Sequence, residues 1–168
     1  MRKLAILGST GSIGQQTLDV VRAFPDRFNV LALAAGNNHP LLAQQVAEFK
    51  PKLVCCRRPD QNDPLRDIEP GLAGMSYEFA SVEAIAASPD VDLVVLATSG
   101  KEGLLPLMAA LGAGKTVALA NKEALIMAGE LIIAECRHHQ ARILPADSEH
   151  SAIWQCLRGE KGGISRLI

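Results

Sequence analysis

Short apolar runs alternate with helical patterns along nearly the whole sequence, and this alternation restricts the fold more than any other feature. The runs are mostly continuous, as expected for strands that are buried on both faces of a sheet. They lie at residues 3–7, 28–34, 52–56, 91–97, 116–120 and 142–144. Helical patterns lie between and after them, at residues 13–24, 40–50, 82–87, 104–111, 122–140 and 151–157. The alternation predicts an α/β fold, a doubly wound, mostly parallel Rossmann-like sheet with helices on both faces.

Two regions fit the pattern less well. Residues 57–76 contain three prolines and two glycines, so we expect a loop there, with a short strand near residues 77–79. Residues 165–168 look like the start of a further strand that stops within the element. Trp154 is expected to pack into the core from the last helix.

Composition excludes several classes of function. The 168 residues carry a net charge of −1 and only 4% aromatic residues, so neither a basic surface nor stacking aromatics indicate a nucleic-acid partner. No apolar stretch approaches the ~20 residues of a membrane span, so we expect no membrane partner. The four cysteines show no CxxC spacing, which favours a reducing, cytoplasmic setting.

A glycine-rich turn, Gly-Ser-Thr-Gly-Ser-Ile-Gly, lies at residues 8–14 between the first predicted strand and the first predicted helix. A turn in this position directs free backbone N–H groups and the helix dipole at a pyrophosphate. The spacing is GxxGxxG rather than the more common GxGxxG, and a glycine-rich turn without a nucleotide is the alternative. No GK[ST] follows, which argues against a nucleoside triphosphatase.

The end of the second strand bears on the type of cofactor. NAD-binding domains usually place Asp or Glu there to hold the ribose 2′-hydroxyl. Residues 34–39 read Ala-Ala-Gly-Asn-Asn-His, and the missing carboxylate favours NADP, whose 2′-phosphate an acid would repel. A ribose that is simply solvated is the alternative.

Two further turns follow strands near the end of the chain. Asn121, Lys122 and Glu123 open the long helix, where Lys122 could meet an anionic substrate and Asn121 could equally be a plain N-cap. Asp147 and Glu149 are two residues apart after the strand at 142–144. In an extended segment they would face the same side and suit Mg²⁺ or Mn²⁺. Helix capping by Asp147 or Ser148, with Glu149 complementing the dipole, is the alternative.

The three turns, in this order and at these separations, resemble the 1-deoxy-D-xylulose 5-phosphate reductoisomerase family. Gln-Thr-Leu-Asp at residues 16–19 and Ala-Ile-Trp-Gln at residues 152–155 are similar to the same family. The resemblance implies an NADPH-dependent enzyme that uses Mg²⁺, Mn²⁺ or Co²⁺. It would rearrange and reduce a small phosphorylated sugar to 2-C-methyl-D-erythritol 4-phosphate, in non-mevalonate isoprenoid synthesis. It also implies a homodimer when the protein is intact.

The resemblance also implies roles for individual residues. Asp147 and Glu149 would be metal ligands and, with Lys122, catalytic; Lys122 and Ser148 would contact the substrate. The cofactor residues would be Gly8, Ser9, Thr10, Gly11, Ser12, Ile13, Gly36, Asn37, Asn38, Asn121 and Glu123. Many family members carry a basic residue at the place of Asn37.

The family is longer than this chain, and its third metal ligand and substrate-phosphate residues come later. We therefore expect residues 1–150 to be an NADP-binding Rossmann-like domain and residues 151–168 to begin a truncated catalytic or connecting region. Such an N-terminal fragment is expected to bind NADPH weakly and not to catalyse. The rival hypotheses are another NADP-dependent oxidoreductase, such as a semialdehyde dehydrogenase, and a non-catalytic nucleotide sensor. Only the reductoisomerase needs both Asp147 and Glu149 as ligands.

Overall fold

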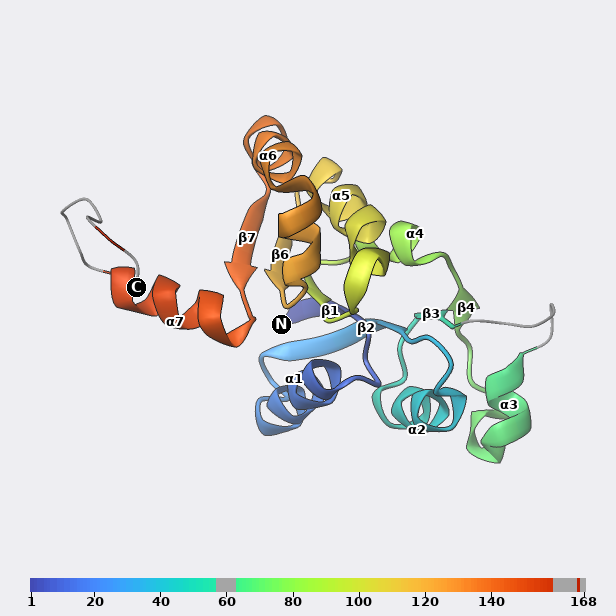
Figure 1. Cartoon of the computed structure of the whole chain (residues 1–168). Helices are drawn as coiled ribbons and strands as arrows, with labels where there is room; N and C mark the ends of the chain where they lie inside the picture. The colour runs from blue at the N-terminus through green and yellow to red at the C-terminus, as the bar shows by residue number, and fades with distance from the viewer. Residues whose placement is uncertain (57–62, 159–165, 167–168) are drawn as a thin grey trace.

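The apolar runs form the strands of one sheet in the computed structural model, which describes residues 1–56, 63–158 and 166 (Figure 1). Every strand pair in this described part of the chain is parallel, and the strand order is β4-β3-β2-β1-β5-β6-β7. The strands are β1 (Arg2–Leu7), β2 (Phe28–Ala34), β3 (Leu53–Cys55), β4 (Glu78–Phe79), β5 (Leu93–Leu96), β6 (Thr116–Leu119) and β7 (Arg142–Pro145). The predicted doubly wound sheet is confirmed.

Helices cover both faces of this sheet (Figure 1). On one face lie α1 (Ser12–Ala23), α2 (His39–Phe49) and α3 (Pro64–Ile68), and on the other lie α4 (Val82–Ala87), α5 (Leu104–Gly112) and α6 (Lys122–His138). Short 3₁₀ turns, η1 (Pro70–Leu72) and η2 (Gly100–Gly103), follow α3 and precede α5. The last helix, α7 (Ser148–Leu157), extends away from the sheet. No described helix is both long and apolar enough to cross a membrane.

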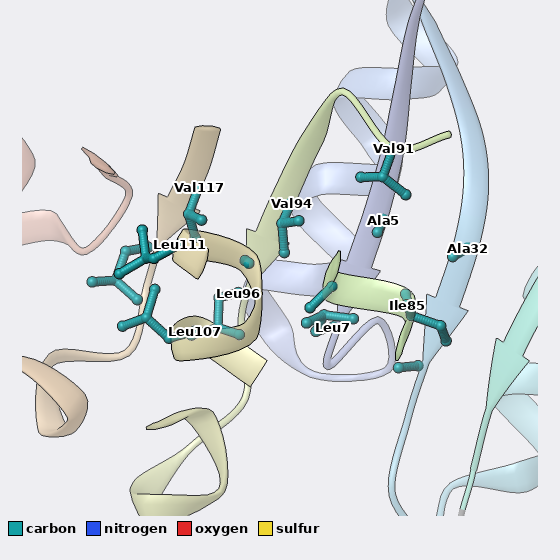
Figure 2. Close-up of a cluster of buried hydrophobic side chains, with 14 of the residues drawn as sticks. Ala5, Leu7, Ala32, Ile85, Val91, Val94, Leu96, Leu107, Leu111 and Val117 are labelled. Atoms are coloured by element: carbon teal, nitrogen blue, oxygen red, sulfur yellow. The ribbon is translucent and has the colours of Figure 1, made fainter. Parts of the chain in front are cut away.

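The two-sided burial of the central strands explains their continuous apolar sequence. In β1, Leu4 and Ile6 belong to the buried cluster beneath α1 and α2, whereas Ala5 and Leu7 belong to the cluster beneath α4 and α5. Successive strand residues point to opposite faces, so a strand covered on both faces needs apolar residues at every position. Figure 2 shows the second cluster, which contains Leu7, Ala32 and Val94 from three strands and Ile85 and Leu107 from the helices.

The direction in which successive strands are added to the sheet reverses between β1 and β5, although the strands themselves stay parallel. From β1 the chain builds outward through β2, β3 and β4, and then returns to β5 on the other side of β1. Leu7 of β1 pairs with Leu96 of β5, and the loops that follow these two strands diverge to opposite faces. In open α/β sheets this switch point is where ligands bind.

The structure corrects several details of the prediction. The stretch expected to be a loop contains α3 and η1, because Asp63 caps α3 and Pro64 and Pro70 occupy first-turn positions. The long helix α6 is kinked at Ala128, whose φ of −145° and ψ of 31° are not helical. Trp154 is 43% exposed rather than buried, because α7 extends away from the sheet and none of its residues is buried. The short strand β4 is confirmed, and the strand expected near residues 165–168 lies outside the described residues.

Beside β4, a polar cluster fixes α3 through the only tyrosine of the sequence. The Tyr77 hydroxyl donates to Asp63 Oδ2 at 2.7 Å, and Arg66 Nε donates to the same oxygen at 3.0 Å. The Arg66 guanidinium also lies 5.3 Å from the centre of the Tyr77 ring. Burial, followed by the hydrogen bond to Asp63, raises the pKa of Tyr77 to about 12.

An absorbance titration of the folded chain is expected to give a tyrosine midpoint near pH 12. The unfolded chain in urea should titrate near pH 10 and serves as the control. Because the folded pKa is the higher one, the stabilisation from this site is fully present below pH 10 and is lost as the pH rises through 12. A folded-state midpoint near pH 10 would show that Tyr77 is neither buried nor bonded to Asp63 as described.

Candidate functional site

The glycine-rich turn joins the buried end of β1 to the start of α1. Gly8 has a φ of +91°, and a Cβ built on it would lie 2.5 Å from the Ala97 carbonyl oxygen of the neighbouring strand end. Gly14, in the first turn of α1, lies so close to the turn that a Cβ would overlap Gly8 O and lie 2.6 Å from Ser9 Cα. Both positions therefore require glycine, one for its backbone conformation and both for close approach of main chains.

The main chain of this turn leaves the start of α1 open to an anion. Gly8 N–H and Ser9 N–H both donate to the Ala34 carbonyl, at 2.8 and 2.9 Å, which ties the turn to the end of β2. Gly11 at the N-cap position supplies no side-chain cap, and the first turn of α1 contains no acidic residue. The first-turn amides have no intrahelical acceptor, so the positive end of the α1 dipole faces outward without a protein anion.

A cleft of about 460 Å³ lies at the carboxyl ends of the central strands, where the switch point predicts a ligand site. Its lining includes Gly8, Gly36 and Asn37, three of the residues assigned to the cofactor from the sequence. The other lining residues are Ala34, Ala35, Cys55, Cys56, Val82, Glu83, Thr98 and Glu102. The two carboxylates of the lining, Glu83 and Glu102, belong to α4 and η2. The segment that follows β2 therefore contributes no carboxylate to the cleft. Asn38 caps α2 by accepting from Leu41 N–H at 3.3 Å.

Asn121 links this cleft to the start of α6. Its Oδ1 accepts from Ala124 N–H at 2.8 Å, so the N-cap that we weighed as an alternative is present. Its Nδ2 donates to the carbonyls of Thr98 and Gly100, at 2.8 and 2.9 Å, and the residue is fully buried. Gly103 packs against this amide so tightly that a Cβ would overlap Nδ2. Asn121 therefore fixes where Lys122 and the exposed Glu123 stand relative to the cleft.

The Lys122 ammonium lies between the two carboxylates that follow β7. Its Nζ is 3.9 Å from Asp147 Oδ2 and 3.8 Å from Glu149 Oε1. Asp147 is only 14% exposed, whereas Glu149 is 70% exposed. The structure thus brings together the three residues to which the sequence assigned catalytic and metal-binding roles.

Their local geometry differs from the prediction. We expected Asp147 and Glu149 in an extended segment, but α7 begins at Ser148, which places Glu149 in its first helical turn. The proximity of the two carboxylates therefore comes from the turn into α7, not from the alternation of a strand. Asp147 stands at the N-cap position without making a side-chain cap bond, so its carboxylate is left for another role. Ser148 is exposed at the first position of the helix.

The electrostatics of Asp147 fit a cation ligand. The neighbouring Glu149, followed by the positive charge of Lys122, holds the pKa of Asp147 below its usual range, so Asp147 is ionised at neutral pH. Its Oδ1 is buried and accepts no hydrogen bond from any described residue. Hard carboxylate oxygens suit Mg²⁺ or Mn²⁺. No group of three or more potential metal-ligating residues occurs in the described part of the chain, so these two carboxylates do not complete a site.

Sequence reasoning missed several members of the site. Thr98 lines the cleft and its carbonyl receives the Asn121 amide, but no local pattern marks it. His150 lies with its Nδ1 3.8 Å from Asp147 Oδ1, and its place beside the Asp-Ser-Glu turn was the available signal. Gln45, which reaches the glycine-rich turn from α2, has no sequence signal at all, because only the tertiary packing shows that it is buried.

The switch-point cleft, the glycine-rich turn and the strand order define an NAD(P)-binding Rossmann-like domain. A family model for 1-deoxy-D-xylulose 5-phosphate reductoisomerase matches residues 4–129. The chain belongs to this family, which confirms the resemblance seen in the sequence.

Relatives and solved structures agree with this assignment. The reductoisomerases of Acaryochloris marina and Synechocystis sp. are 46% and 47% identical over the whole of this chain, which spans 43% and 44% of their lengths. A crystal structure of DOX-P reductoisomerase with NADPH, fosmidomycin and magnesium superposes with a TM-score of 0.86 at 42% identity, covering 93% of this chain and 39% of that one. The Zymomonas mobilis enzyme with NADPH gives 0.82 at 40% identity, covering 92% and 41%. A biliverdin reductase from Synechocystis sp., at 22% identity with a TM-score of 0.62 and coverage of 98% and 44%, shares the fold.

Proposed function

We propose that this chain supplies the NADPH-binding part and two metal-binding carboxylates of a 1-deoxy-D-xylulose 5-phosphate reductoisomerase. The product would be 2-C-methyl-D-erythritol 4-phosphate. One observation carries the proposal: Asn121 ties the dinucleotide cleft to Lys122, which contacts Asp147 and Glu149. Cofactor and cation would then meet at one edge of the sheet. The related structures that contain NADPH and magnesium support it.

In this proposal, different residues of the chain bind different parts of the cofactor. The turn residues Gly8, Ser9, Thr10, Gly11, Ser12 and Ile13 hold the cofactor's diphosphate at the open start of α1. Gly36, Asn37 and Asn38 lie by the adenosine ribose and its 2′-phosphate, which no carboxylate after β2 repels. Asn121 and Glu123 lie by the nicotinamide half.

After β7, Asp147 and Glu149 would bind the divalent cation. Any further protein ligand of this cation would come from outside the described residues. Lys122 and Ser148 contact the substrate, where the ammonium stabilises negative charge that develops on a substrate oxygen. When bound, NADPH supplies a hydride and Mg²⁺, Mn²⁺ or Co²⁺ withdraws electron density from the substrate's oxygens.

We further propose residues 1–150 as the cofactor domain, residues 151–168 as the start of the catalytic or connecting region, and a homodimer for the intact protein.

The test of the cofactor assignment is a calorimetric titration of this chain with NADPH and, separately, with NADH. Binding that saturates and clearly prefers NADPH supports the proposal. A nucleotide sensor would also bind the cofactor, but no metal-dependent activity would depend on its Asp147 and Glu149.

A further inference from the structure

A buried glutamine on α2 holds the glycine-rich turn from behind. Gln45 is 3% exposed, and its Nε2 donates to the Ser9 carbonyl oxygen at 3.0 Å, across 36 residues of sequence. The acceptor is a carbonyl, so the amide NH₂ must be the group that faces it. The Oε1 of Gln45 is buried and accepts no hydrogen bond from any described residue, so burial of this amide is unfavourable and a packing role alone would be better served by an apolar residue. The neighbouring Gln44 is exposed.

This bond fixes the orientation of the peptide group between Ser9 and Thr10. The described chain contains no cis peptide bond, and in a planar trans peptide the C=O and the following N–H point in opposite directions. Because Ser9 C=O points to Gln45 on α2, Thr10 N–H must point away from α2. The other side of Ser9 is also fixed, since its N–H donates to the Ala34 carbonyl at 2.9 Å.

The next peptide group is fixed in the same manner. Gln15 Nε2 donates to the Thr10 carbonyl at 3.0 Å, and Gly11 N–H turns inward to the Gly8 carbonyl at 3.0 Å. Gly11 N–H is therefore used within the turn, whereas the N–H groups of Gly8 and Ser9 are used by the Ala34 carbonyl at the end of β2. Among the amides of residues 8–11, which precede α1, Thr10 N–H is the one left pointing outward, and the Gln45 side chain holds it in that orientation.

We propose that Gln45 is a positioning residue for the cofactor's diphosphate, aiming Thr10 N–H at a phosphate oxygen through its bond to Ser9. This inference rests on the proposed function and assigns to α2 a part in diphosphate recognition. It predicts that Gln45→Met, which keeps the volume and loses the donor, weakens NADPH binding about tenfold, the equivalent of one hydrogen bond.

The experiment compares Gln45→Met with Gln44→Met, a matched change at the exposed neighbour, in the full 168-residue chain. Each variant is titrated with NADPH and with adenosine 2′-monophosphate, which has no diphosphate. We expect Gln45→Met to lose affinity for NADPH but not for the monophosphate, and Gln44→Met to keep both affinities. Equal NADPH affinity in the two variants, or an equal loss for both ligands, overturns the positioning role.

A second measurement holds even if Gln45→Met fails to fold. In the ¹⁵N-labelled wild-type chain, NADPH should shift the Thr10 amide resonance strongly and adenosine 2′-monophosphate should not. An unshifted Thr10 amide in a chain that binds NADPH overturns the inference while the proposed function stands. A wild-type chain that does not bind NADPH overturns the proposed function, and the inference with it.

Discussion

Replacing Gly14 with alanine is expected to abolish NADPH binding and to lower the free energy of unfolding by about 2–3 kcal/mol. The added Cβ would overlap Gly8 O and approach Ser9 Cα to 2.6 Å. Both neighbours are main-chain atoms, so no side chain can rotate away. Relief requires either that α1 lifts from β1 or that the turn opens, and both movements displace the amides that face the diphosphate.

Thermal unfolding followed by circular dichroism, with calorimetric titration of NADPH, measures both effects. Gly112→Ala is the control, because a Cβ there meets nothing within 4 Å and the residue ends helix α5. Its unfolding free energy should stay within about 0.5 kcal/mol of the wild type. A Gly14→Ala chain that melts and binds like the control would show that α1 does not pack on the turn as described.

Replacing Asp147 with asparagine is expected to reduce metal-dependent turnover by at least about 100-fold, since a bound metal supplies several kcal/mol of charge stabilisation. The change keeps the side-chain shape but removes the negative charge and one acceptor oxygen. Asp147 is the less exposed member of the pair, with a buried Oδ1 that accepts no hydrogen bond from any described residue, whereas Glu149 is largely exposed. The measurement is NADPH oxidation at increasing Mg²⁺, in an enzyme of full family length that carries this sequence.

Glu130→Gln is the matched control for charge, because Glu130 is exposed on α6 and follows the kink at Ala128. Its turnover and Mg²⁺ dependence should equal those of the parent enzyme. If Asp147→Asn keeps full turnover at the same Mg²⁺ concentration, the carboxylate is not a metal ligand, and the ion pair with Lys122 is only structural.

The sequence predicted the features that local physics determines. The continuous apolar residues of β1 and β5 follow from burial on both faces, and Gly8 and Gly14 follow from a turn that brings main chains into contact. Both patterns lie within a few adjacent residues, so they can be recognised in the sequence without knowledge of the tertiary structure. The missing carboxylate after β2 is readable for the same reason.

What the sequence could not predict depends on contacts between distant segments. The start of α7 at Ser148 rather than Ser151 follows from where β7 ends, and the helical turn rather than strand alternation brings Glu149 beside Asp147. Trp154 was misplaced because an aromatic residue in a short helix gives no sign that its helix leaves the sheet. Gln45 looks like any polar helix residue until α2 is packed against the turn.

The central claim is that the cleft at the carboxyl ends of the central strands binds NADPH, and calorimetric titration of the wild-type chain tests it most directly. We expect saturable one-site binding of NADPH and at least about tenfold weaker binding of NADH, a difference of about 1.4 kcal/mol. Gly14→Ala should abolish the NADPH signal in the same experiment. Equal affinity for the two cofactors, or no binding by a chain that is shown to be folded, would contradict the account.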